Sequence, residues 1–235
     1  AIKQVRISLK QGTGPAQGTI KFARISAVGN TWSVQPGTTT TDGDLLQAVA
    51  VNNLDNVDYT PIYNAGGDAG TVFTNLYGSV SEQKQRTNAK NLSEQTLSIS
   101  YTGVTSTATA YVYRKFTRPI DIAQHGQFRF LLKPAALDPG ASFYLQLGDS
   151  NNYFRAEIPL NFTTWRLVTI NQEDLNGDNI PDIWVNGSNF EITVSSKGSP
   201  SLQQVPQILA GFSTTESAVH SGTVYLNEIH LAKPL

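Results

Sequence analysis

The sequence contains no cysteine and no methionine among its 235 residues, and only 15% of its residues are charged. Without cysteine, the chain cannot form a disulfide scaffold, a zinc finger or a thiol-based catalytic site. Lysine and arginine number 17 and aspartate and glutamate 18, so the net charge is −1. This balance argues against a nucleic-acid-binding protein, because neutralising phosphates requires an excess of basic residues.

Long hydrophobic runs are also missing. No apolar stretch approaches the ~20 residues of a membrane helix, so we expect no membrane-spanning segment. The chain begins at Ala1, which leads us to expect a processed product or a piece of a longer chain. A cysteine-free surface of low charge that is rich in threonine, serine and asparagine favours an extracellular or periplasmic location.

The dominant positive signal is the alternation of apolar and polar residues in short runs. In the first run Val5, Ile7 and Leu9 fall on one face of a strand, with polar residues between them. Similar runs, bounded by Gly, Pro, Asn or Asp, lie at 18–28, 46–51, 71–76, 96–101, 108–116, 127–133, 142–147, 153–158, 165–170, 182–185, 190–194, 207–212 and 223–231. Many short strands with frequent turns predict an all-β fold, namely an antiparallel jelly-roll-like β-sandwich.

Signals for helices are scarce. Segment 81–91 (SEQKQRTNAKN) has a helical composition but no apolar stripe, so we expect a solvated loop there. Segment 63–70 (YNAGGDAG) is predicted to be a glycine-rich loop, followed by a strand at 71–76. We therefore expect no helix longer than about three turns.

One internal similarity predicts a module boundary. Gln4-Val5, followed by 18–20 and Ile25, resembles Gln204-Val205, followed by 222–224 and Ile229. The alternative is a chance similarity between two β-hairpins. We interpret residues 1–30 as the closing β-hairpin of a preceding module or an edge hairpin, and residues 31–235 as a β-sandwich module. An isolated hairpin is marginally stable, so this one should dock on its own module or on a neighbouring copy.

Several short sequence motifs, in order along the chain, suggest a family. They are Val51-Asn52 with Pro61-Ile62-Tyr63, 93–98 (SEQTLS), 147–154 (LGDSNNYF) with 157–160 (EIPL), 197–202 (KGSPSL) and 222–231 (GTVYLNEIHL). Together they resemble the repeated soluble modules of SprA-type giant outer-membrane proteins of type IX secretion and gliding. His230 and Leu226 depart from the family pattern, and no membrane-spanning barrel strand is identifiable. The resemblance implies a jelly-roll-like sandwich similar to carbohydrate-binding modules, in a cell-surface protein.

The most specific local motif is the loop 173–182 (EDLNGDNIPD). It carries side-chain oxygens at Asp174, Asn176, Asp178 and Asp182. Hard cations such as Ca²⁺ take about six to eight oxygen ligands around one point. Gly177 permits the turn, and the Ile180 carbonyl would add a backbone ligand. The motif resembles the calcium loops of dockerin and thrombospondin type 3 repeats, without the closing bidentate glutamate of an EF-hand. Since these residues also favour simple turns, the alternative is a polar hairpin. Carboxylate repulsion without a counter-ion favours a structural Ca²⁺.

Aromatic residues form a second candidate site. Trp32, Trp165, Trp184 and the pair Tyr153-Phe154 would offer a stacking platform for sugars. Alternatively, Trp165 and Trp184 belong to alternating runs and fill the sandwich core. We favour the core.

Catalytic signals are weak. The histidines are His125, His220 and His230, and neither GxSxG nor HExxH occurs. Asp149 and Glu157 could be imagined as a glycosidase pair. Glu157 alternates with Arg155 on one strand face, however, which indicates a surface ion pair. No enzyme activity is expected.

These observations lead to one preferred function and one alternative. We predict a non-catalytic β-sandwich module of a bacterial cell-surface or secretion-associated protein, stabilised by calcium. Its partners would be neighbouring modules or other cell-surface proteins. The alternative is a carbohydrate-binding module with a polysaccharide ligand.

Overall fold

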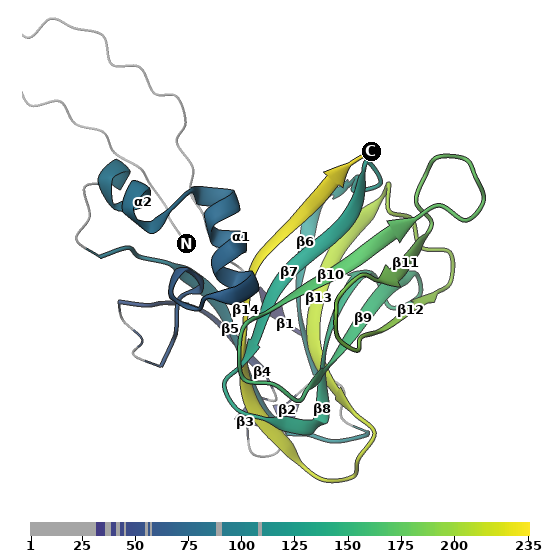
Figure 1. Ribbon diagram of the computed structural model, residues 1–235. Helices are drawn as coiled ribbons and strands as arrows, with labels where there is room; N and C mark the ends of the chain where they lie inside the picture. The colour runs from purple at the N-terminus through teal and green to yellow at the C-terminus, as the bar shows by residue number, and fades with distance from the viewer. Residues whose placement is uncertain are drawn as a thin grey trace, which may run out of the picture. The chain divides into compact units, whose positions relative to one another are not determined.

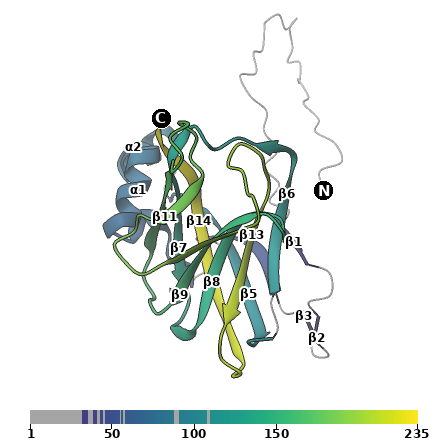
Figure 2. The ribbon, with the colours of Figure 1, turned by 90° about the vertical axis from the view of Figure 1, so that its right-hand side faces the viewer.

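Most of the alternating runs that the structure describes become strands in two facing antiparallel sheets (Figures 1 and 2). The structure is a computed structural model that describes residues 32–35, 39–40, 43–44, 46–54, 56, 58–87, 91–107 and 110–235. The hairpin predicted at 1–30 lies outside the described residues.

The first sheet has the order β1-β6-β13-β8-β9-β12. Its strands are β1 (Ser33–Val34), β6 (Ala110–Ile120), β13 (Val205–Thr214), β8 (Asp138–Gly148), β9 (Tyr153–Leu160) and β12 (Thr193–Lys197). All of its pairings are antiparallel. Strands distant in the sequence are neighbours here, as expected for a sandwich with crossover connections.

The second sheet has the order β11-β10-β7-β14-β5-β4. Its strands are β11 (Ile183–Asn186), β10 (Arg166–Glu173), β7 (His125–Pro134), β14 (His220–Pro234), β5 (Gln95–Val104) and β4 (Leu46–Asn52). These pairings are antiparallel as well. A short separate ribbon joins β2 (Thr39–Thr40) and β3 (Gly43–Asp44). The predicted all-β, jelly-roll-like antiparallel sandwich is thus confirmed.

The hydrophobic core fills the space between the two sheets. Phe130 of the second sheet meets Phe143 of the first, with ring centroids 6.4 Å apart. Tyr101 stacks on Phe212 at 4.0 Å. Trp184 lies between Phe128 and Phe154, at 5.6 Å from each. Each such buried side chain stabilises the fold by ~1.5–3 kcal/mol, so this layer dominates the stability.

A second hydrophobic cluster lies on the outer face of the second sheet. Helical elements cover this face, as Figure 1 shows: the 3₁₀ turn η1 (Ile62–Asn64), α1 (Gly67–Tyr77) and α2 (Val80–Thr87). Ala69, Val72 and Phe73 of α1 are buried in one cluster with Leu131, Trp165 and Tyr225. Trp165 also donates its indole N–H to the Thr60 carbonyl at 2.9 Å. In the described part of the chain, no helix is both long and apolar enough to span a membrane.

Three local expectations were wrong. The strand expected at 71–76 and part of the loop expected at 63–70 belong to α1. Residues 69, 72 and 73 have the helical spacing i, i+3, i+4, and packing on the sheet selects the helix. The loop expected at 81–91 contains α2.

Helix α2 is held by its N-terminal cap rather than by an apolar stripe. The Ser79 backbone N–H donates to Glu82 Oε2 at 2.6 Å, and the Glu82 N–H donates to Ser79 Oγ at 3.2 Å. This is the reciprocal capping box of the pattern Ser-x-x-Glu. The pattern was present in the sequence as Ser79-Val80-Ser81-Glu82 and could have predicted the helix. The expectation that no helix exceeds about three turns agrees with the 11 residues of α1.

Candidate functional site

The outer face of the first sheet carries a row of polar and aromatic side chains. Strand β9 alternates strictly, with Phe154, Ala156 and Ile158 buried in the core. The residues between them, Tyr153, Arg155 and Glu157, therefore point outward. The neighbouring strands follow the same rule, and they bring further side chains to this face: Tyr111 and Tyr113 of β6, Leu209 and Ser213 of β13, and Tyr144 and Gln146 of β8.

The strand register aligns these side chains across the sheet. Gly211 is paired with Tyr111 on one side and with Tyr144 on the other. Tyr144 is in turn paired with Glu157, and Gln146 with Arg155. Side chains opposite each other on neighbouring strands lie within contact distance. The register therefore assembles one continuous polar and aromatic face from strands that are distant in the sequence.

Arg155 is the centre of this arrangement. Its guanidinium donates to Gln146 Oε1 from Nε at 3.0 Å and from Nη2 at 2.8 Å. Nη1 pairs with Glu157 Oε1 at 3.2 Å. The same group lies over the ring of Tyr144 at 4.2 Å and over that of Tyr153 at 5.1 Å. Since a guanidinium has five N–H donors, these contacts fix its orientation and leave donors free.

A hollow of about 230 Å³ opens beside Arg155 on this face. It is smaller than the ~300–1,000 Å³ of pockets that engulf a small molecule, so a ligand would lie across it. Burial raises the pKa of Tyr144, although the charge of Arg155 acts in the opposite direction. Its phenol therefore stays protonated at neutral pH. The hollow is lined by Tyr111, Tyr144, Gln146, Ser150, Tyr153, Arg155, Lys197, Leu209 and Ser213.

These groups suit the two kinds of surface that a sugar ring presents. The C–H face of a pyranose packs on an aromatic ring, and Tyr111 and Tyr153 line the hollow with theirs. Paired ring hydroxyls bind planar donors and acceptors, which Arg155 and Glu157 supply in fixed positions. The arrangement offers binding groups but no separate pair of carboxylates on this face among the lining residues.

Sequence reasoning found only part of this face. It singled out Tyr153, Arg155 and Glu157, and the predicted ion pair of Arg155 with Glu157 is confirmed, with side chains 25% and 32% exposed. It missed Tyr111, Tyr144 and Gln146. Their outward positions in two alternating runs were a usable signal, but only the strand order brings them to Arg155.

Both tryptophans expected in the sandwich core are buried, but the expectation is correct for Trp184 and wrong for Trp165. Trp184 belongs to the sandwich core with Phe154, whereas Trp165 belongs to the second cluster beneath the helices. Trp32 is partly buried and packs against the core. Of the aromatic platform considered from the sequence, only Tyr153 reaches the candidate face.

The predicted calcium loop lies between β10 and β11, and its oxygens bind its own backbone. Asp174 accepts hydrogen bonds from the N–H groups of Gly177 and Asn179, both at 2.7 Å. The bond from Gly177 is the largest cause that lowers the pKa of Asp174.

The other predicted ligands behave similarly. Asn176 accepts from Asp178, Asp178 from Ile180, and Asp182 from Leu175, at 2.8–3.1 Å. In the part of the chain that the structure describes, no group of three or more His, Asp or Glu residues is gathered closely enough to hold a metal ion. These residues thus form a polar turn with free carboxylate lone pairs, and calcium binding stays a prediction.

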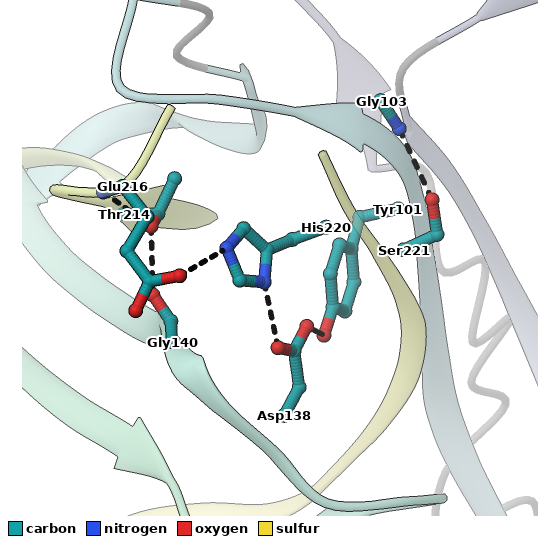
Figure 3. A network of polar contacts seen from close by, with 8 residues as sticks. All are labelled: Tyr101, Gly103, Asp138, Gly140, Thr214, Glu216, His220 and Ser221. Carbon is teal, nitrogen blue, oxygen red and sulfur yellow. Dashed lines mark hydrogen bonds and ion pairs between the residues drawn. The ribbon is translucent and has the colours of Figure 1, made fainter. Parts of the chain in front are cut away.

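The histidines do not assemble a nucleophilic site. His220 Nδ1 lies 2.7 Å from Asp138 Oδ1, and Tyr101 donates to Asp138 Oδ2 at 2.7 Å (Figure 3). Glu216 Oε2 lies 3.5 Å from His220 Nε2. Ser221, the next residue, points away and accepts from the Gly103 N–H at 3.2 Å (Figure 3). This partly buried network ties β5, β8 and β14 together, and it places carboxylates at both nitrogens of the imidazole.

The two carboxylates that sequence reasoning considered as a glycosidase pair have separate roles. Asp149 accepts from the N–H groups of Asn151 and Asn152 at 2.7 and 2.8 Å, which closes the β8–β9 turn. Glu157 pairs with Arg155. His125 lies at the start of β7 and His230 near the end of β14.

Comparison with known proteins supports the fold. No protein-family model and no curated protein matches the chain. Among solved structures it is similar to part of an exo-beta-agarase, with a TM-score of 0.50 and 12% identity over 89% of this chain and 24% of that one. The chain thus spans about a quarter of that enzyme's length.

Two further structures show weaker similarity. A family 11 carbohydrate-binding module from Clostridium thermocellum, in complex with a mixed-linked tetrasaccharide, gives a TM-score of 0.46 and 12% identity over 88% of this chain and 92% of that one. An agarase gives 0.43 and 12% identity over 60% and 22% of the two chains.

Proposed function

We propose that this protein is a non-catalytic carbohydrate-binding module that holds a polysaccharide on the outer face of its first sheet. The observation that carries the proposal is the cluster of Arg155 with Gln146, Glu157 and two tyrosine rings beside a shallow hollow. Because similarity at 12% identity concerns the fold, the function is argued from this face.

The hollow suits a chain better than an isolated sugar. It is lined by residues of several neighbouring strands on one open sheet face, so a polysaccharide can continue beyond the bound unit. Arg155 is already oriented by Gln146, and its side chain is 25% exposed. A sugar hydroxyl that meets it therefore costs little further side-chain entropy.

The proposal also places the module in an extracellular or periplasmic protein at a bacterial cell surface. This location rests on the low-charge, cysteine-free composition and on the SprA-type resemblance. Treating intact cells with a protease and detecting the module with an antibody tests it. Digestion in intact cells would show a surface location, and digestion only after the outer membrane is permeabilised would show a periplasmic one. Protection in both, with digestion in lysed cells, would place the module inside.

Affinity gels cast with agarose, mixed-linkage β-glucan or a polyuronate test the binding. We expect at least one polysaccharide to retard the protein, and Arg155→Gln to weaken that binding by about 10–100-fold, the value of hydrogen bonds to a charged group. Arg166→Gln is the matched control, because Arg166 also stacks on aromatic rings, at 4.2 Å over Phe162, but on the second sheet.

A tyrosine pair separates stacking from hydrogen bonding. Tyr153→Phe should keep most of the affinity, whereas Tyr153→Ala should lose it, with unchanged melting temperatures for both. If no polysaccharide retards a folded protein, or if Arg155→Gln and Arg166→Gln behave alike, the face does not bind sugar. The protein-interaction role predicted from the sequence would then be the better description.

A further inference from the structure

A second and larger cavity lies on the opposite side of the molecule, between the helices and the second sheet. Its volume is about 480 Å³, within the ~300–1,000 Å³ typical of small-molecule sites. No lysine, arginine or histidine is among the described residues that line it. The lining residues are Tyr63, Phe73, Tyr77, Gln83, Thr87, Asn91, Leu92, Ser93, Glu94, Gln95 and Glu228.

The first carboxylate of this cavity, Glu94, is fixed by neutral donors. It accepts the Ile62 N–H at 2.9 and 3.1 Å and an Asn227 side-chain N–H at 3.1 Å. The Tyr59 hydroxyl also donates to it. None of these described partners carries a positive charge, so they orient the Glu94 carboxylate without neutralising its negative charge.

The second carboxylate, Glu228, stands on an irregular part of β14. The register of β14 shifts between Asn227 and His230, and Glu228 has a φ of 48°. Such a backbone conformation is uncommon for a residue other than glycine, and outliers of this kind cluster at functional sites. Tyr77 donates its hydroxyl to both oxygens of Glu228, at 2.9 and 3.0 Å.

Three aromatic rings form a continuous wall of the cavity. The ring centroids of Tyr63 and Phe73 are 5.5 Å apart, and those of Phe73 and Tyr77 are 5.3 Å apart. An aromatic face attracts a cation through its quadrupole, and the attraction grows when the site is desolvated. Rings and carboxylates that share one cavity therefore favour the same kind of ligand.

We infer that this cavity is a binding site for a small organic cation, an alkylammonium or guanidinium group on a short apolar stem. The charged end would lie between Glu94 and Glu228, and the stem would pack on Tyr63, Phe73 and Tyr77. A simple metal ion would leave the aromatic wall unused. The site lies on the other sheet from the proposed sugar face, so its test is independent of that function.

The protonation of the cavity supports this reading. Burial raises the pKa of both Glu94 and Glu228, and the charge of Glu228 further raises the pKa of Glu94. The charge of His230 acts on the pKa of Glu228 in the opposite direction. Burial and Glu228 raise the pKa of Tyr77 to about 12, so its hydroxyl remains a donor. A bound cation would replace the neutralising charge that the described lining residues lack.

Isothermal titration calorimetry and NMR with three probes of similar size test the inference: n-butylammonium, n-butylguanidinium and neutral 1-butanol. We expect the two cations to bind the intact chain and shift the NMR signals of Phe73, Tyr77 and Glu228. We expect butanol to bind at least about tenfold more weakly, the difference made by a charged hydrogen bond. Equal binding of butanol, or no binding of either cation, would overturn the inference.

Two further measurements test whether the carboxylates bind the cation. Glu228→Gln should weaken the binding of n-butylammonium by about tenfold. Glu191 is an exposed acid elsewhere, and Glu191→Gln should leave this affinity unchanged. In the unaltered protein, affinity for n-butylammonium should rise as the pH increases through the raised pKa of Glu228, because only the ionised carboxylate attracts the cation. Equal affinities of the two variants would contradict the assignment. An affinity of the unaltered protein that is independent of pH would also contradict it, and this second test does not depend on the stability of Glu228→Gln.

Discussion

Gly211 shows how one residue shapes the candidate sugar face. A Cβ added there would lie 2.6 Å from the Tyr144 ring and 2.5 Å from the backbone oxygen of Ala110. The ring of Tyr144 can therefore lie against position 211 only because that position has no side chain. Arg155 in turn stacks on that ring, so the glycine sets the position of the guanidinium.

Replacing Gly211 with alanine should lower the free energy of unfolding by about 1–3 kcal/mol, as for other overpacked sites. Urea unfolding measures the loss, and the near-UV circular dichroism of the tyrosines should change with it. Gly70→Ala is the control, since a Cβ there meets nothing within 4 Å. In the interior of α1 this control should stabilise by about 0.5–1 kcal/mol. Equal effects of the two changes would show that Tyr144 moves without cost.

Glu228 makes stability depend on pH. Because burial raises its folded-state pKa above the ordinary value of 4.5, the folded state holds this proton more tightly than the unfolded state. The stabilisation is complete below pH 4.5 and is lost as the pH rises through the raised value. Glu228→Gln replaces the titrating carboxyl group with a neutral amide, so the variant should gain stability relative to the unaltered protein as the pH rises from 4.5 through the raised pKa.

Melting temperatures of both proteins across that range check this prediction. Gln retains an acceptor for the Tyr77 hydroxyl, so the comparison isolates the charge. Parallel curves would mean that Glu228 titrates in the folded state as it does in an exposed peptide.

At the scale of elements, Glu94 attaches the helical layer to the second sheet. Its carboxylate, next to the start of β5, accepts the backbone N–H of Ile62, the first residue of η1. Asn227 of β14 donates to the same carboxylate at 3.1 Å. One side chain therefore joins a turn and two strands, and η1 leads directly into α1.

Glu94→Ala should cost about 2–3 kcal/mol in unfolding free energy, because buried donors are left without acceptors. Hydrogen exchange should show the loss concentrated in α1 and η1, with the sandwich core still protected. Glu191→Ala, an exposed glutamate, should be neutral. A uniform loss of protection across both sheets would show instead that the layer and the sandwich unfold as one unit.

The loop 174–182 is the element on which the calcium prediction depends. If Ca²⁺ binds there, a chelator should lower the melting temperature and added Ca²⁺ should restore it, because a ligand bound only by the native state adds about 2.7 kcal/mol at 100 times its Kd. Asp178→Ala should abolish the response. Identical melting curves with chelator and with Ca²⁺ would leave the loop as a turn held by the backbone bonds of Asp174 and Asp178.

At the scale of the whole molecule, the described residues form a sandwich core of their own. The buried core residues run from Leu46 to Leu226 and come from both sheets. Deleting residues 1–30 should therefore leave a cooperative thermal transition, while self-association or solubility changes as predicted for an edge hairpin. Size-exclusion chromatography and melting curves of the shortened chain decide this. Complete unfolding would show that the hairpin is integral to the sandwich.

The sequence by itself was sufficient for the fold class and for most strands. Period-two alternation reports which side of a strand is buried, and strand β9 follows it without exception. The same local rule identified the ion pair of Arg155 and Glu157, two residues apart on one face. It failed at α1, where the Gly- and Thr-rich segment has weak intrinsic preference and packing against Leu131 and Trp165 decided the structure.

Only the tertiary structure could decide where ligands bind. Tyr111, Tyr144 and Arg155 meet because β13 lies between β6 and β8, and β9 lies beyond β8. Glu94 and Glu228 meet because β5 pairs with β14. Alternation assigns each side chain to a face of its own strand, but it carries no information about which strands are neighbours. That order is set by the cooperative packing of the whole core, and both candidate sites depend on it.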